Sequence, residues 1–128
     1  MTMSDDRYVT PNEQLIVELY ASDIKASCAF YRAFGFEVVR EESRFLVLRW
    51  EDSMLFLEEV ENCPLSEHQA GNIRVMVANV DHYWELATKF GARVIRPIED
   101  RYYGLRDFTI AGPDGIGLRF ATRLPDSH

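Results

Sequence analysis

An internal repeat constrains the fold of this chain more than any other feature. Displacing the sequence by 56 positions aligns residues 16–40 with residues 72–96 without a gap. Each copy reads as an alternating strand, a helix and a second strand. Gly35 and Gly91 coincide just after the helices, where a left-handed cap favours glycine. The repeat therefore predicts two copies of one supersecondary unit.

Further strands follow each helix, so each copy reads β-α-β-β-β. Asp23 and Asn79 coincide as candidate helix N-caps. The later strands are predicted at residues 37–41, 45–50 and 53–60, and at residues 92–98, 106–111 and 117–122. Residues 99–105 have no counterpart in the first copy, which predicts an inserted loop of the kind that often contacts ligands. We expect tails at residues 1–12 and 124–128 around one domain, residues 13–123, built from modules at 13–60 and 71–123 and a linker at 61–70.

Composition narrows the function classes. The 128 residues are 47% apolar and carry a formal charge of -7, so nucleic acid and anionic membranes are disfavoured partners. No apolar run approaches the roughly 20 residues of a membrane span. The two cysteines, Cys28 and Cys63, form no disulfide framework and suggest reduced thiols in the cytoplasm. An acidic protein would attract a cationic small molecule.

Two stretches carry a family resemblance. The pattern F-Y-x-x-x-G-F stands at residues 30–36, and the run Y-G-L-R-D-F-T-I-A-G-P-D-G-I-G-L-R-F stands at residues 103–120. Together with the repeat, they resemble the glyoxalase, bleomycin-resistance and extradiol-dioxygenase superfamily. The resemblance implies an α+β fold in which two tandem β-α-β-β-β modules form curved mixed sheets around a cavity. It also implies a homodimer.

The same resemblance locates a possible metal site. Catalytic members hold a divalent metal with His and Glu side chains on the first and fourth strands of each module. Those positions fall on Ile16, Phe56, Asn72 and Arg119. Ile and Phe offer no lone pair, an arginine repels cations and a lone Asn amide is a poor anchor. We therefore expect no metal and no other cofactor, although a carboxylate-only site at Glu18 and Glu58 is conceivable.

Strand alternation assigns the cavity face once Ile16 is placed inward. Ligand-binding residues are then predicted among the inward polar groups and the available aromatic rings: Glu18, Tyr20, Trp50, Phe56, Glu58, Arg74, Tyr102, Tyr103 and Arg119. Glu18 is expected to pair with Arg74 or Arg119 across the cavity. A site dominated by the carboxylates would hold a planar cation, and one dominated by the arginines would hold a carboxylate or a phosphate-like group. Overall charge favours the cation.

Three functions remain open. The first is a metal-free protein, similar to bleomycin resistance proteins, that sequesters an aromatic or cationic compound and has no catalytic residues. The second is a glyoxalase- or dioxygenase-type enzyme, a lyase, isomerase or oxygenase, with a displaced metal or none and with Glu18 as general base. The third is a scaffold whose cavity is plugged by Arg119 and Phe56. The expected partners are a small molecule and a second copy of the chain.

Overall fold

The computed structural model describes residues 8–61 and 71–125. The chain divides between residues 62 and 63 into two compact units, which we call module one and module two. The predicted linker lies outside the described residues except for Glu61, as does most of each predicted tail. Part of the N-terminal tail is ordered instead as a short helix, α1 (Pro11–Gln14). None of the helices in the described ranges has the length and apolar character needed to cross a bilayer.

Module one contains β1 (Val17–Ala21), α2 (Ile24–Ala33), β2 (Glu37–Glu41), β3 (Phe45–Trp50) and β4 (Ser53–Glu59). Its sheet has the order β1-β4-β3-β2, in which β1 runs parallel to β4 and the other pairs are antiparallel. The predicted strand, helix and three-strand sequence is therefore confirmed for the first copy.

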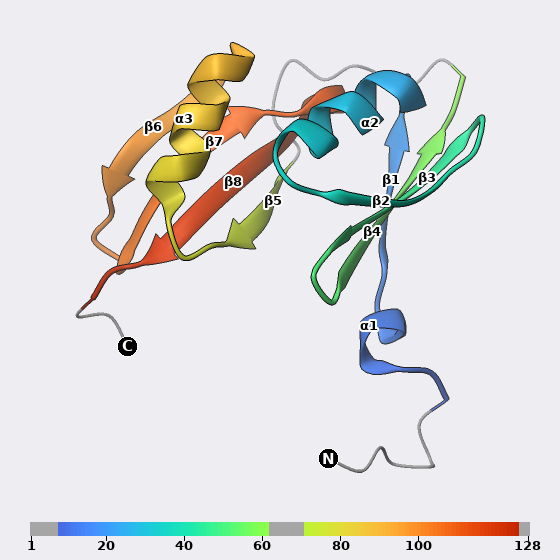
Figure 1. Cartoon of the computed structure of the whole chain (residues 1–128), viewed down its shortest axis with the longest axis horizontal. Helices are drawn as coiled ribbons and strands as arrows, with labels where there is room; N and C mark the ends of the chain where they lie inside the picture. Colours follow the sequence, from blue (N-terminus) through green and yellow to red (C-terminus); the bar gives the residue numbers. More distant parts are fainter. Residues whose placement is uncertain (1–7, 62–70, 126–128) are drawn as a thin grey trace. The chain divides into compact units, whose positions relative to one another are not determined.

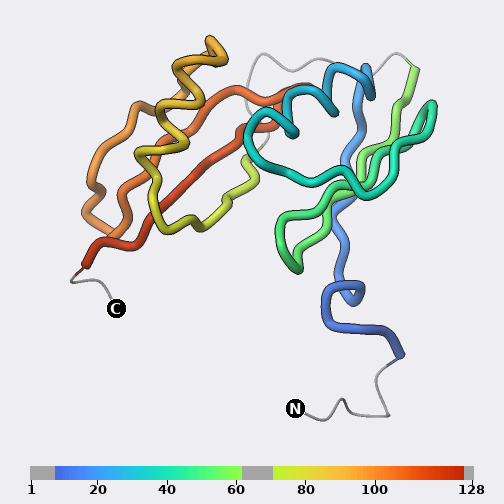
Figure 2. Tube along the Cα trace, viewed as in Figure 1, coloured from blue at the N-terminus to red at the C-terminus, as the bar shows by residue number. Residues whose placement is uncertain are grey.

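Module two contains β5 (Gly71–Met76), α3 (Val80–Phe90), β6 (Val94–Asp100), β7 (Leu105–Ala111), a turn of 3-10 helix at Pro113–Gly115, and β8 (Ile116–Arg123). Its sheet has the order β5-β8-β7-β6, with β5 parallel to β8. Figure 1 shows α3 lying along one face of this sheet. The chain path in Figure 2 follows the same sequence of elements in each module, so the repeat and the α+β fold are confirmed.

The core of each module lies between its helix and its sheet. In module one, Tyr31 and Phe34 from the α2 segment are buried with Leu46 and Leu48 of β3. Each fully buried side chain of this size contributes about 1.5–3 kcal/mol through removal of apolar surface from water. Module two buries the equivalent set beneath α3: Val80, Ala87, Phe108, Ile110, Leu118 and Phe120. Each module therefore has a core of its own, formed by one helix packed on one sheet.

Side chains accept hydrogen bonds from the first backbone amides of both helices. Asp23 accepts a hydrogen bond from the Ala26 amide, which confirms the predicted cap of α2. Asn79 occupies the predicted N-cap position of α3, but its side chain makes no cap hydrogen bond. The first amide of α3, that of Val80, instead donates to Thr122 Oγ1 at 2.8 Å. A residue distant in sequence thus supplies the acceptor that the local pattern assigned to Asn79.

The helix C-termini differ slightly from one another. Gly91 is the cap of α3 and has a left-handed backbone (φ 77°), as predicted. In the first copy the cap is Phe34, and Gly35 follows it with φ 109°. Both glycines therefore occupy backbone conformations that residues with a Cβ rarely adopt.

The loop predicted at residues 99–105 is shorter than expected. Glu99 pairs with Asp107 and Asp100 pairs with Arg106, which extends β6 and β7 into the predicted loop. Only residues 101–104 remain as a turn between the two strands. The difference arises because register shifts in β6 at Arg96 and Glu99 absorb extra residues, and the alternation pattern does not reveal them.

Candidate functional site

Each sheet has one face covered by its helix and an opposite face, which we call the open face. In module one the register places Glu18 beside Phe56 and Tyr20 beside Glu58, so these four predicted site residues share the open face. Tyr20 is 64% exposed. The Phe56 ring contacts that of Phe45 with centroids 5.5 Å apart. The open face of module one therefore combines aromatic surface with two carboxylates.

Trp50 lies on the other face of this sheet, and its predicted ligand-binding role stays a prediction. Trp50 pairs with Ser53 at the end of β3. Because alternate residues of a strand share a face, Trp50 lies on the same face as the buried Leu46 and Leu48. Its ring contacts Phe36 at 5.1 Å, and Phe36 in turn contacts Tyr31 of α2. Trp50 therefore packs with the helix-covered core, because the strand continues its alternation to its last residue.

The open face of module two carries the predicted Asn72, Arg74 and Arg119. Arg74 pairs in register with Arg119, and Arg119 pairs with Thr109 on β7. The three residues are thus brought together as the sequence predicted. The pairing of Glu18 with Arg74 or Arg119 would join the two modules and stays a prediction.

Asp107 organises the polar groups on this open face. Its Oδ1 accepts from Arg101 Nε at 2.8 Å, and its Oδ2 accepts from Arg119 Nη2 at 2.6 Å and from Arg119 Nε at 3.1 Å. The Tyr103 hydroxyl also donates to Oδ2, at 2.8 Å. Arg101 forms a second ion pair with Glu99. Because Asp107 is only 1% exposed, this cluster is a charge network held against the sheet.

The network shifts the pKa of two of its members, Asp107 and Arg101. Burial would raise the pKa of the Asp107 carboxyl, but hydrogen bonds from Arg101, Arg119 and Tyr103 outweigh it and lower the pKa below its ordinary value. The hydrogen bond to Asp107 raises the pKa of Arg101. The Arg119 guanidinium is therefore fixed by a carboxylate that stays charged at neutral pH.

The two tyrosines of the β6–β7 turn have different roles. Tyr103 belongs to the network, since its hydroxyl bonds Asp107 and the Arg119 Cζ lies 5.6 Å from its ring centroid. Tyr102 is 99% exposed and its ring contacts that of Tyr103. The predicted ligand-binding role of both residues remains a prediction, with Tyr103 the better placed of the two.

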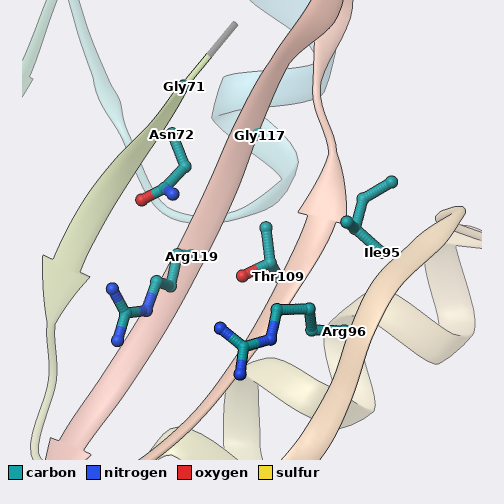
Figure 3. A pocket seen from close by; sticks show the side chains of 7 residues that line it. All are labelled: Gly71, Asn72, Ile95, Arg96, Thr109, Gly117 and Arg119. Carbon is teal, nitrogen blue, oxygen red and sulfur yellow. The ribbon is translucent and has the colours of Figure 1, made fainter. Parts of the chain in front are cut away.

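A pocket of about 170 Å³ opens beside this network. It is lined by residues from all four strands of the sheet: Gly71, Asn72, Ile95, Arg96, Thr109, Gly117 and Arg119. Figure 3 shows the Arg119 and Arg96 side chains, from β8 and β6, extending on either side of Thr109. Arg119 thus lines the pocket without closing it, so the plugged-cavity interpretation is not favoured in module two.

Several residues of this site were missed in the sequence: Arg96, Arg101, Asp107 and Thr109. Asp107 did carry a signal, since this acid stands directly before the apolar Phe108 in a strand whose alternation places it on the open face. Arg96 carried none, because the register shift beside it hides which face it occupies.

The residues at the four positions implied for a metal do not fit one. Asn72 and Arg119 line the pocket, and the only formal charge they bring is positive. Phe56 lies in β4 and Ile16 immediately precedes β1. Across residues 8–61 and 71–125, no group of three or more His, Cys, Asp or Glu side chains could hold a metal ion. The donor chemistry therefore supports no step through a metal at this place.

Comparison with known proteins gives a consistent family and fold. The model of the Glyoxalase/Bleomycin resistance protein/Dioxygenase superfamily matches residues 14–120. No curated protein sequence matches the chain. Among solved structures, a glyoxalase/bleomycin resistance protein/dioxygenase from Nocardioides is 16% identical, with a TM-score of 0.75 over 93% of this chain and 88% of that one.

A bleomycin resistance determinant and a bleomycin-binding protein are also similar in structure. A bleomycin resistance determinant encoded on the transposon Tn5 is 19% identical, with a TM-score of 0.69 over 86% of this chain and 97% of that one. A bleomycin-binding protein complexed with bleomycin is also 19% identical, with a TM-score of 0.67 over 86% of this chain and 98% of that one. At these identities the similarity shows the fold.

Proposed function

This chain belongs to the Glyoxalase/Bleomycin resistance protein/Dioxygenase superfamily, and from that membership we propose that it is a metal-free protein that binds and sequesters a small aromatic compound. One observation carries the proposal. At the position implied for a metal ligand on β8 stands Arg119, whose guanidinium Asp107 holds in place. A fixed positive charge supported by a buried carboxylate excludes a cation from the same place. Such a site can bind a molecule but has no Lewis acid with which to activate it.

Module one by itself offers an aromatic surface that a small molecule can contact. Tyr20 is largely exposed, and Phe56 and Phe45 lie on the same open face. Rings on an accessible sheet face supply the apolar contact surface that small-molecule sites use for affinity. That a protein of the same fold was solved with bleomycin supports small-molecule binding as the use of the scaffold.

Equilibrium titration tests the proposal. Bleomycin and a panel of flat aromatic compounds are titrated while tryptophan fluorescence and heat are recorded, and at least one compound is expected to bind below millimolar concentration. Tyr20→Ala should weaken that binding by about tenfold, since burial of one ring against a ligand is worth on the order of 1–2 kcal/mol. Tyr8→Ala is the matched control, because Tyr8 is exposed and precedes α1.

Elemental analysis of protein purified without chelator separates binding from catalysis. Stoichiometric Ni, Zn, Mn or Fe would contradict the proposal and would favour an enzyme of the glyoxalase or dioxygenase type. Binding with no metal and with the compound recovered unchanged would support sequestration.

The assembly and location are part of the same proposal. We infer a homodimer, because each sheet has two edge strands whose unpaired backbone groups a partner can cover, and sedimentation at several protein concentrations tests it. We infer a cytoplasmic protein, because Cys28 is a buried free thiol whose pKa is raised by burial, as expected of an inert reduced cysteine.

A further inference from the structure

The pocket in module two contains polar donors that its own protein leaves unused. Thr109 is 6% exposed, yet within the described ranges its hydroxyl has no hydrogen-bond partner. The Asn72 amide and the Arg96 guanidinium also lack one among the same residues. Arg119 uses Nε and Nη2 on Asp107, which leaves Nη1. Four donor groups from four strands thus line one small pocket. Thr109 is buried, while the Asn72 and Arg96 side chains are exposed, so a ligand that enters the pocket can reach these donors.

The charge around the pocket is positive although the chain as a whole is acidic. Arg101 and Arg119 are balanced by Asp107 and Glu99. Arg96 then adds one charge, for which the described part of the chain provides no carboxylate within ion-pair distance. Arg74 adds a second next to Arg119 in register. At physiological ionic strength charges beyond about 8 Å are largely screened, so this local surplus outweighs the formal charge of -7.

The shape of the pocket limits what can enter it. A volume of about 170 Å³ is below the roughly 300–1,000 Å³ of complete ligand sites, so it suits one compact group of a larger molecule. Gly71 and Gly117 contribute no side chains to the wall, which leaves the backbone approachable. A planar or tetrahedral oxyanion is small enough, and guanidinium forks match its oxygen atoms.

We propose that this pocket, which lies within module two, binds an oxyanionic group, a carboxylate or a phosphate, of a small molecule that the protein sequesters. This inference rests on the proposed function and reverses the cationic preference that overall composition indicated. Arg96 and Arg119 Nη1 provide the charge-assisted hydrogen bonds, while Asn72 and Thr109 provide neutral donors. Asp107 acts as a positioning residue that holds Arg119.

Benzoate, phenyl phosphate and benzamidine are the probes that test the proposal, because they share a ring and differ in the charged group. Each is titrated into the full chain through the millimolar range while the backbone amide signals of Asn72, Thr109 and Gly117 are followed by heteronuclear NMR. Saturable shifts with benzoate or phenyl phosphate, and none with benzamidine, are expected. The relative response to the two anions identifies the oxyanion as carboxylate or phosphate.

Substitution of Arg96 tests whether the response comes from the pocket. Arg96→Gln should raise the Kd for the bound anion by about tenfold, because it removes the guanidinium that has no internal partner. Arg93→Gln is the matched control, since Arg93 is exposed and does not line the pocket. Saturation by benzamidine, the absence of saturable shifts with both anions, or an equal effect of the two substitutions would each overturn the proposal.

The outcomes separate this inference from the function on which it rests. Tight binding of an aromatic compound together with no anion response at Thr109 would remove the oxyanion site and leave sequestration standing. A saturable anion response with no aromatic compound bound below millimolar concentration would support the oxyanion site and contradict sequestration of an aromatic compound.

Discussion

Asp107 is the residue on which the geometry of the open face of module two depends. Its carboxylate accepts from Arg101, Arg119 and Tyr103, and its side chain is only 2% exposed. Asp107→Asn removes the negative charge and leaves two guanidinium groups without it, which should lower the free energy of unfolding by about 3 kcal/mol. Urea denaturation measures this change. Asp100→Asn is the control: Asp100 forms an exposed ion pair with Arg106, so its loss should cost under about 1 kcal/mol.

The same residue predicts a pH dependence. The pKa of Asp107 lies below its ordinary value of 3.8 in the folded state, so the unfolded state binds the proton more readily. Its contribution to stability is therefore complete above pH 3.8 and is lost as the pH falls from there through the folded pKa. The stability lost between about pH 6 and about pH 3 should be smaller in Asp107→Asn than in the wild type. An identical loss in both proteins would contradict the assignment.

The helices of the two modules begin in the same way, with an acceptor from the last strand of the sheet. Ile24 N donates to Glu59 Oε1 at 2.9 Å, and Val80 N donates to Thr122 Oγ1, which itself donates to the Val77 carbonyl. Thr122→Val keeps the shape and removes both bonds, so it should destabilise the protein by about 1–2 kcal/mol in thermal unfolding. Thr88→Val is the control on the exposed side of α3 and should change stability by less than about 0.5 kcal/mol. Equal effects would show that the cap is not what stabilises the helix start.

The elements themselves were predictable because local rules determine them. Strand alternation and helix periodicity placed β2 and β3 at their observed bounds and the other strands within two residues. The rules failed where the partner of a residue is distant in sequence. Asn79 stands at the N-cap of α3 but makes no cap bond, while Thr122 accepts from the Val80 amide. Trp50 contacts Phe36 on the helix side of its sheet. The register shifts that lengthen β6 leave no mark in the pattern of apolar residues.

The candidate site was predictable only in part, for a related reason. Strand alternation placed Asn72 and Arg74 on one face, and the family resemblance added Arg119, which is the register partner of Arg74. The sequence could not reveal the ion pair between Asp107 and Arg119, because that pairing depends on the β7–β8 register. The sign of the charge around the pocket depends on which arginines form an ion pair with a carboxylate. The formal charge summed over the chain contains no such information.

At the scale of the whole molecule, the fold of this superfamily is expected to be stable without metal. A structural or catalytic ion that binds only the folded state stabilises it by mass action, about 2.7 kcal/mol at a hundredfold excess over Kd, and its removal lowers the melting temperature. On the open face of module two, Asn72 offers one amide and Arg119 a guanidinium. Metal binding at these residues therefore cannot stabilise the folded state. We therefore expect EDTA, followed by Zn²⁺ or Ni²⁺ in excess of EDTA, to leave the melting temperature unchanged in differential scanning calorimetry. A fall with EDTA that either metal reverses would mean that side chains elsewhere bind an ion, and it would contradict the proposal of a metal-free protein.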